Sequence, residues 1–194
     1  MHKRNIKNIF LLALCAMLAA CQNAPQQKIK QGNCRIHGVM ESDKWNGKYI
    51  FLVPLEGVRD SLTVDSLVIE NREFEFVVDT CEMKILRVDY HFRQGLQDLL
   101  VVSEPGDVEV FLGRISSGGG TPQNDSMQVW KSRKDKFSAD YDRLRKQNKK
   151  HDSLKIIQRE SKAFTRDVAE RMSPGVFKDF LNARYPARKD KKTE

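Results

Sequence analysis

Apolar and polar residues alternate along the part of the chain between residues 33 and 114. In the clearest example, at 73–78 (EFEFVV), Glu73 and Glu75 separate the apolar side chains. A period of two places successive side chains on opposite faces of a β-strand. The pattern predicts seven short strands, interpreted as an antiparallel β-sandwich-like domain or a strongly curved sheet. The expected strands cover residues 34–38, 49–53, 62–64, 74–78, 83–92, 98–102 and 108–112.

Two segments are rich in turn residues. Pro105-Gly106 is typical of a type II turn, because Pro fixes φ at the first central position and Gly supplies a positive φ at the second. The segment 116–121 (SSGGGT) contains three consecutive glycines, but no Gly-Lys-Ser/Thr of a phosphate-binding loop follows them. We therefore expect a flexible joint here, inside a Gly-rich linker at 115–123 that ends a β domain at 33–114.

After this linker the hydrophobic period changes to 3.6, which predicts an α-helical arm at 124–184. Two helices at about 124–148 and 152–172 are expected to fold back as a hairpin, with one long helix as the alternative. A short third helix is expected to start at Ser173-Pro174, and a charged disordered tail to cover 185–194. The predicted fold class is thus α+β. The apolar helix positions are Trp130, Phe137, Tyr141, Leu144, Leu154, Ile157, Phe164 and Val168.

The N-terminus has the three regions of a secretory signal peptide at 1–20: positive charges, an apolar run and small residues. The run is about a dozen residues, short of the roughly 20 that span a bilayer. Leu18-Ala19-Ala20-Cys21 resembles the bacterial lipoprotein signal, which implies cleavage between Ala20 and Cys21 and acylation of Cys21. An ordinary signal peptide with a Cys near its end is the alternative. We expect a flexible tether at 21–32 and, since no acidic run follows Cys21, a periplasm-facing protein of the cell envelope.

The charge is distributed unevenly. Between residues 21 and 130 there are 11 Lys and Arg against 16 Asp and Glu, whereas residues 131–194 contain 20 against 10. The overall net charge of +8 therefore describes neither half. Because acidic residues are interleaved with the basic ones, we interpret the C-terminal half as a solvated helical surface. An anionic membrane surface and an acidic protein partner are the alternatives, and no nucleic-acid partner is expected.

Several motifs in order resemble the domain of unknown function 4369, which is common in lipoproteins of Bacteroidota. The resemblance covers about residues 33–130 and, more loosely, the helices. It implies a β domain followed by a helical hairpin, and in longer relatives a thioredoxin-like domain. This chain ends where that domain would begin and has no Cys-x-x-Cys, so redox activity is not carried over. The motifs are CRIHG at 34–38, GKYIFL at 47–52, DS at 60–61 with FEF at 74–76, EPGD at 104–107 and GTPQND at 120–125.

The sequence contains no recognisable catalytic motif. It lacks Gly-x-Ser-x-Gly, His-Glu-x-x-His and cysteines at zinc-binding spacing. His37, His91 and His151 fall in separate predicted elements, so no metal site or cofactor is predicted. Glu104 stands out only through the family motif, and a turn-stabilising carboxylate is favoured there over a catalytic base. We therefore do not expect an enzyme.

Two kinds of covalent modification are candidates besides acylation. Cys34 and Cys81 are the thiols that remain after Cys21 is acylated, and an oxidising compartment permits a structural disulfide between them, with two free thiols as the alternative. The tripeptide Asp-Ser-apolar resembles the acceptor of O-glycosylation in Bacteroidota, whereas turn and cap chemistry explains it equally simply. Its serines are Ser61, Ser66, Ser126 and Ser153.

These observations favour a non-catalytic lipoprotein of the cell envelope. We expect the lipid on Cys21 to hold it at a membrane and an unidentified envelope protein or glycan to bind it. The alternative, implied by the family resemblance, is an auxiliary partner of a separate thioredoxin-like thiol-disulfide oxidoreductase.

Overall fold

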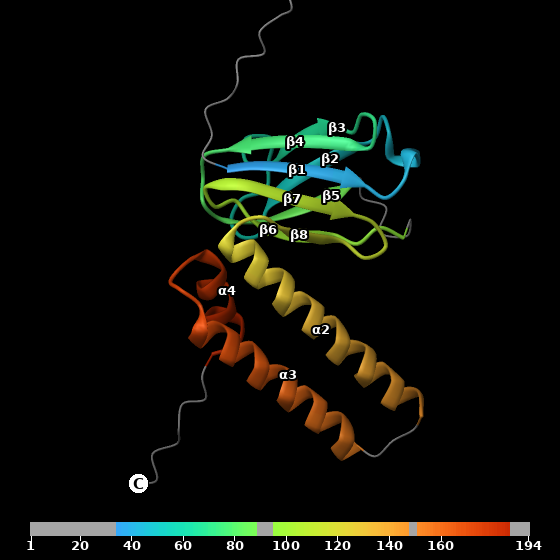
Figure 1. Ribbon diagram of the computed structural model, residues 1–194, viewed down its shortest axis with the longest axis vertical. Helices are drawn as coiled ribbons and strands as arrows, with labels where there is room; N and C mark the ends of the chain where they lie inside the picture. Colours follow the sequence, from blue (N-terminus) through green and yellow to red (C-terminus); the bar gives the residue numbers. More distant parts are fainter. Residues whose placement is uncertain (1–33, 89–94, 148–150, 187–194) are drawn as a thin grey trace, which may run out of the picture. The chain divides into compact units, whose positions relative to one another are not determined.

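The computed structural model describes residues 34–88, 95–147 and 151–186. The predicted signal peptide, the tether and Cys21 therefore lie outside the described residues, as do His91 and the end of the strand expected at 83–92. Within the described part, eight strands form two four-stranded sheets, and three α-helices follow them (Figure 1). The predicted α+β class is confirmed.

Sheet A has the strand order β4-β1-β7-β8. Its strands are β4 (Glu73–Val78), β1 (Cys34–Met40), β7 (Gly106–Leu112) and β8 (Ser117–Gly119). The pairs β4–β1 and β7–β8 are antiparallel, but β1 and β7 are parallel, with Ile36 opposite Val108. The predicted antiparallel β-sandwich-like domain thus also contains one parallel pair, and the long stretch of chain between β1 and β7 provides the crossover that a parallel pair needs.

Sheet B is antiparallel throughout, in the order β3-β2-β5-β6. Its strands are β3 (Asp65–Val68), β2 (Tyr49–Pro54), β5 (Met83–Val88) and β6 (Leu99–Val102). The strand expected at 62–64 was misplaced. The Asp60 carboxylate accepts the backbone N–H groups of Leu62 and Thr63 at 2.9 and 3.2 Å, which makes a turn and leaves the Leu62 side chain 93% exposed.

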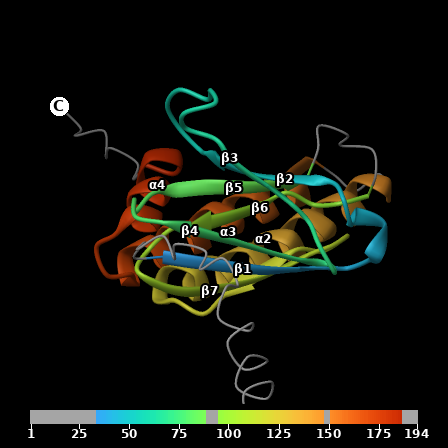
Figure 2. The same cartoon turned by 90° about the horizontal axis from the view of Figure 1, so that it is seen from above.

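The two sheets pack face to face around one apolar cluster (Figure 2). Ile36 and Val108 contribute from sheet A, and Leu52 and Leu86 from sheet B; all four are fully buried. Trp45, in the short 3₁₀ helix η1 (Asp43–Trp45), belongs to the same cluster. The inward positions are those that the alternating pattern selects, so the β-sandwich-like part is the one most directly readable from the sequence.

The helices α2 (Pro122–Lys146) and α3 (His151–Arg171) form the predicted hairpin (Figure 1). Trp130 Nε1 donates to Thr165 Oγ1 at 3.1 Å, and Lys134 Nζ donates to Ser161 Oγ at 2.7 Å. From Trp130 to Lys134 the residue number increases along α2, while that of the partner decreases from Thr165 to Ser161 along α3. The two helices are therefore antiparallel. The alternative of one long helix is wrong.

A second apolar cluster joins the helices to sheet B. It contains Met83 of β5 and Val102 of β6 together with Trp130, Phe177 and others from all three helices. The third helix, α4 (Val176–Arg184), begins after Gly175 rather than at Ser173. Tyr185 packs against the same cluster, so the tail expected at 185–194 cannot include it; residues 187–194 lie outside the described part.

Candidate functional site

Gly118 and Gly119 belong to the strand β8 and not to a flexible joint, and Gly120 follows directly after it. In β8, Gly118 pairs with Val110 and Gly119 with Glu109 of β7. A side chain would collide at two of them: a Cβ on Gly119 would be 2.7 Å from Asp125 Oδ1, and one on Gly120 would be 2.5 Å from the Asp107 carbonyl oxygen. Gly120 also has a φ of +97°. Gly120 in particular has a positive φ and lies close to a neighbouring backbone segment, and Ser117–Gly119 pair as a strand. These observations correct the flexible joint expected inside the linker at 115–123.

The first two turns of α2 bind one edge of each sheet, at β6 in sheet B and at β8 in sheet A. Asn124 accepts the Val102 N–H at 2.9 Å and donates to the Val102 carbonyl at 2.8 Å, so its amide pairs with β6 as another strand would. At the edge of sheet A, Gln128 Oε1 accepts the Gly118 N–H at 3.1 Å and Asp125 Oδ1 accepts the Gly120 N–H at 2.8 Å. Exposed strand edges invite further pairing, and α2 covers both of these.

Glu104, in the connection between β6 and β7, holds the start of α2. Its Oε1 accepts the backbone N–H groups of Gln123 and Asn124 at 2.6 and 3.3 Å, and its Oε2 accepts from Gln123 Nε2 at 3.0 Å. Thr121, the N-cap residue, makes no side-chain cap bond. A carboxylate here satisfies free N–H groups and faces the positive end of the helix dipole. Glu104 is therefore a stabilising carboxylate, although it stabilises the helix start rather than its own turn.

This contact brings together two motifs that the sequence separates. Glu104 belongs to EPGD at 104–107, and the residues it binds belong to GTPQND at 120–125. Gln123 extends the connection, since its Oε1 accepts the Phe177 N–H of α4 at 3.0 Å. The two motifs thus form a buried junction that holds α2 and α4 against the sheets.

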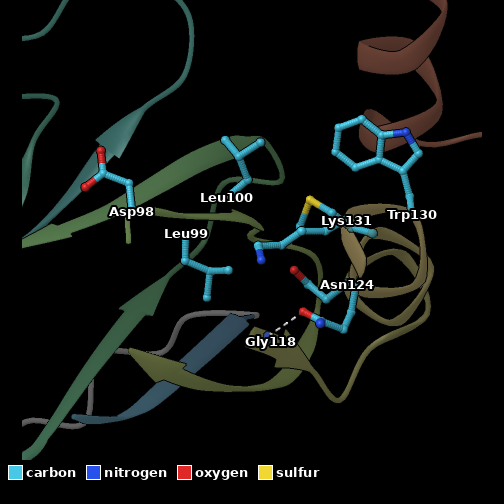
Figure 3. A pocket seen from close by; sticks show the side chains of 9 residues that line it. Asp98, Leu99, Leu100, Gly118, Asn124, Trp130 and Lys131 are labelled. Carbon is cyan, nitrogen blue, oxygen red and sulfur yellow. Dashed lines mark hydrogen bonds between the residues drawn. The ribbon is translucent and has the colours of Figure 1, made fainter. Parts of the chain in front are cut away.

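A small pocket of about 120 Å³ lies beneath this junction, between β6, β8 and α2 (Figure 3). Its walls are mainly apolar, with Leu99, Leu100 and Trp130 among them. The charged groups on its rim are already paired: Lys131 with Asp135 at 2.8 Å and Asp98 with Arg87 at 2.6 Å. We interpret this pocket as a packing gap, because its charged and amide side chains already have structural partners.

A larger groove of about 600 Å³ lies on the other side of β8, on the outer face of sheet A. It is open to solvent and bounded by β7, β8 and the first turns of α2. Its apolar lining includes Phe111 and Val129, which are 40% and 65% exposed. Two carboxylates, Glu109 from β7 and Asp125 from α2, also line it. Val39 of β1 and Val110 of β7 also contribute to the apolar lining.

The outer face of sheet A is mostly acidic around this groove. Arg35 forms ion pairs with Glu75 at 2.7 Å and, more distantly, with Asp107 at 3.8 Å. His37 Nδ1 lies 2.8 Å from Glu109 Oε2, which gives this histidine a carboxylate partner. Among the described residues of the four strands, Arg35 is the only Lys or Arg. The strands of this face therefore carry a net negative charge, which favours cations over anions.

The two cysteines lie at one end of sheet A as free thiols. Cys34 is opposite Val78, three residues before Cys81. Burial raises the pKa of Cys34 to about 11, with smaller contributions from Cys81 and Glu104. The pKa of the exposed Cys81 is raised as well, by partial burial and then by Glu104 and Glu82. Raised values make both thiols poor nucleophiles at neutral pH, and the disulfide stays a prediction.

The remaining candidate residues are dispersed. Among the described residues, no three His, Cys, Asp or Glu side chains gather closely enough to hold a metal ion. Ser61 and Ser66 are exposed, in a turn and in β3, while Ser126 and Ser153 are half-buried on helices. Ser126 Oγ also donates to the Pro122 carbonyl at 2.8 Å, a structural role for that serine. The side chain of His151 lies outside the described part.

Comparisons of the chain with family models, curated proteins and solved structures find no match. Of the helices that the structure describes, none has the length and apolar character needed to cross a bilayer.

Sequence reasoning did not find the groove. Its apolar lining includes Val39, Phe111 and Val129, which come from three different elements, β1, β7 and α2. The only local signal was that Phe111 and Val129 are apolar at positions that face away from the core. The parallel pairing of β1 with β7 and the strand β8 are both needed to bring them together, and neither was predicted.

Proposed function

We propose that this protein is a non-catalytic, lipid-anchored binding module of the bacterial cell envelope, and that it holds an envelope partner in the groove on sheet A. The observation that carries the proposal is the groove itself. Exposed Phe111 and Val129 lie together beside a concave surface, whereas isolated apolar residues on a surface need no explanation. Protein segments are commonly recognised in exposed grooves with an apolar lining.

The anchor is supported by the sequence at 18–21. Cleavage before Cys21 and acylation of its thiol would tie residue 34, where β1 begins, to a bilayer through a short polar tether. Two or more acyl chains hold a protein stably at a membrane, whereas one binds only marginally.

The rigid junction also supports a binding role. Asn124 and Glu104 are almost fully buried, and their hydrogen bonds fix the start of α2. Gln128 and Asp125 then bind Gly118 and Gly120 on the other wall of the groove. A preformed groove loses little conformational entropy when it binds, which favours affinity. The raised pKa of both thiols gives no support to a redox role for this chain itself.

Site-specific photo-crosslinking in intact cells tests this proposal. A photoreactive amino acid is placed at Val129 in the groove, or at one of two exposed control positions, Val58 in a loop or Ile156 on α3. We expect a discrete crosslinked product from Val129 and none from Val58. A product only from Ile156 would place the binding surface on the helical arm instead of the groove. The absence of a product at all three positions would contradict a binding role.

The anchor is tested in the same cells. Wild-type protein is expected in the detergent-soluble membrane fraction, and Cys21→Ala is expected to be released or left unprocessed. Wild-type protein that is efficiently processed yet soluble without detergent would contradict the lipid anchor.

A further inference from the structure

We propose that the occupant of the groove is a cationic polypeptide segment of a partner protein, in which Lys or Arg side chains lie next to an apolar side chain. The inference rests on the proposed binding function and adds the chemistry of the ligand. It follows from where the two carboxylates of the groove lie relative to its glycines.

Gly119 lies between the two carboxylates. It is directly opposite Glu109 in the β7–β8 pairing, and cross-strand neighbours share a face of the sheet. From the helix side, Asp125 Oδ1 is 2.7 Å from the position that a Cβ on Gly119 would take. Because Gly119 has no side chain, Asp125 can approach the strand here, on the sheet face that Glu109 also shares. A Lys ammonium or Arg guanidinium above Gly119 would be within reach of both.

Both carboxylates retain capacity for a cation. Asp125 uses one oxygen, Oδ1, to accept the Gly120 N–H, and Glu109 uses Oε2 towards His37. The side chain of Glu109 is 60% exposed. A carboxylate has about four acceptor sites, so each has room for a charge-assisted hydrogen bond from a ligand.

The apolar lining supplies the second half of the recognition. Phe111 and Val129 border the same groove as the two carboxylates, and their exposed area loses contact with water when an apolar side chain covers it. A purely cationic ligand would leave this apolar surface in contact with water, and a purely apolar ligand would offer the two carboxylates no positive charge.

The wider field selects against other ligand classes. Glu73, Glu75 and Asp107 lie on the same outer face of sheet A, where Arg35 is the only Lys or Arg among the described strand residues. Phosphate groups of nucleic acids and of anionic lipids would be repelled by this face. A positively charged protein segment is steered towards it, with an association rate that falls as salt screens the charges.

Fluorescence anisotropy with the full-length protein in detergent tests the inference. The probe is a short labelled peptide in which Lys residues flank a Phe, and the matched peptides carry Glu in place of each Lys or Ala in place of the Phe. We expect the Lys peptide to bind at least about fivefold more tightly than either matched peptide at low salt. Equal affinity for the Lys and Glu peptides would overturn the inference.

Variants locate the binding. Glu109→Gln combined with Asp125→Asn removes both charges while Asn keeps an oxygen for the Gly120 N–H, and Glu109→Gln alone serves if the double variant does not fold. We expect the dissociation constant of the Lys peptide to rise about fivefold in these groove variants. The control is Glu73→Gln, which removes a carboxylate on the same face outside the groove lining and should change the dissociation constant less than about twofold. An unchanged dissociation constant in the groove variants would overturn the inference.

The two proposals fail in different ways. If Val129 forms a crosslink but the Lys and Glu peptides bind equally well, the binding function is supported and the inference of a cationic ligand is wrong. A salt-sensitive dimer, detected by sedimentation and lost in the groove variants, would identify the occupant as a second copy of this chain and overturn the partner-protein inference.

Discussion

Lys84 is a charged residue in an unusual position, because its side chain is only 4% exposed. Its Nζ lies 2.8 Å from Glu82 Oε1, on the residue just before β5. The hydrogen bond from Lys84, followed by one from Thr80, lowers the pKa of Glu82 below its ordinary value, although partial burial acts in the opposite direction. A carboxylate stabilised in this way favours the folded state only while it is ionised.

The direction of this shift predicts an acid sensitivity. The Glu82 contribution is fully present above the unfolded-state pKa of about 4.3 and is lost as the pH falls through the lower folded-state value. Because the Glu82 side chain is 41% exposed, we expect only about 0.5–1 kcal/mol of stability from it. Urea unfolding at neutral and acidic pH measures the effect, and Glu82→Gln should remove this part of the pH dependence.

A second variant checks that the partner is Lys84. Lys84→Met keeps the apolar length of the side chain but removes the charge, so it should flatten the same part of the pH profile. A Glu82→Gln protein that retains the full wild-type pH dependence would assign the acid sensitivity to other groups.

At the scale of elements, the sequence predicted the strands with a regular alternation of apolar and polar residues, but it did not predict β8. The burial of β1 and β4 follows the alternation of their residues, and the prediction of these strands was correct to within a few residues. In β8 the sequence is Ser-Gly-Gly, which carries no alternation and resembles a linker. What makes it a strand is its pairing with β7 and its contacts with Asp125 and Gln128, and these come from tertiary structure.

The helices show the same division. The 3.6-residue period predicted the hairpin because one apolar side of each helix is half-buried against the other. The start of α4 was misplaced by two to three residues, since Ser173-Pro174 is a good local start signal that the chain does not use. Helix α4 instead begins where the Phe177 N–H meets Gln123, a contact across 54 residues.

Two glycine substitutions distinguish a packed strand from a flexible joint. Gly120 and Gly57 both have a positive φ, +97° and +88°, but a Cβ on Gly57 would meet nothing within 4 Å whereas one on Gly120 would be 2.5 Å from the Asp107 carbonyl oxygen. We expect Gly57→Ala to cost about 1 kcal/mol through backbone strain alone. Gly120→Ala should cost clearly more, about 2–4 kcal/mol, as the strand moves to relieve the collision.

The free energies of unfolding of both variants, measured in urea, provide the comparison. A flexible joint would tolerate Gly120→Ala as well as Gly57→Ala or better, because Ala restricts the unfolded chain. Equal costs for the two variants would therefore contradict the close packing of residue 120.

At the scale of the whole chain, the sequence indicates two parts and the structure joins them. The change of period near residue 120 suggested a β domain and a separate helical arm. The apolar cluster that contains Met83 and Val102 of sheet B also contains Trp130 and Phe177 of the helices. The groove has the same composite character, since β7, β8 and α2 all contribute to its walls. Local sequence patterns cannot predict such a site, because no single contributing segment carries a motif for binding.

The shared cluster predicts that the described strands and helices unfold in one cooperative transition. The chain has two tryptophans, one in each apolar cluster: Trp45 in the sandwich core and Trp130 where the helices meet sheet B. Trp45→Phe leaves Trp130 to report on the junction, and Trp130→Phe leaves Trp45 to report on the sandwich. Within each variant, the midpoint of the fluorescence change in urea should coincide with the midpoint of the far-UV circular dichroism change.

Comparing the two probes inside one variant matters because Trp130→Phe also removes the hydrogen bond to Thr165 and so lowers stability by itself. Cooperative unfolding follows if separating the helices from sheet B exposes Trp130, Phe177 and Leu181, which are buried together. That exposure costs more than a helical hairpin without this contact can offset, since isolated helices are marginal in water. A circular dichroism transition in two steps, with Trp45 following only one of them, would show that the strands and the helices unfold as separate units.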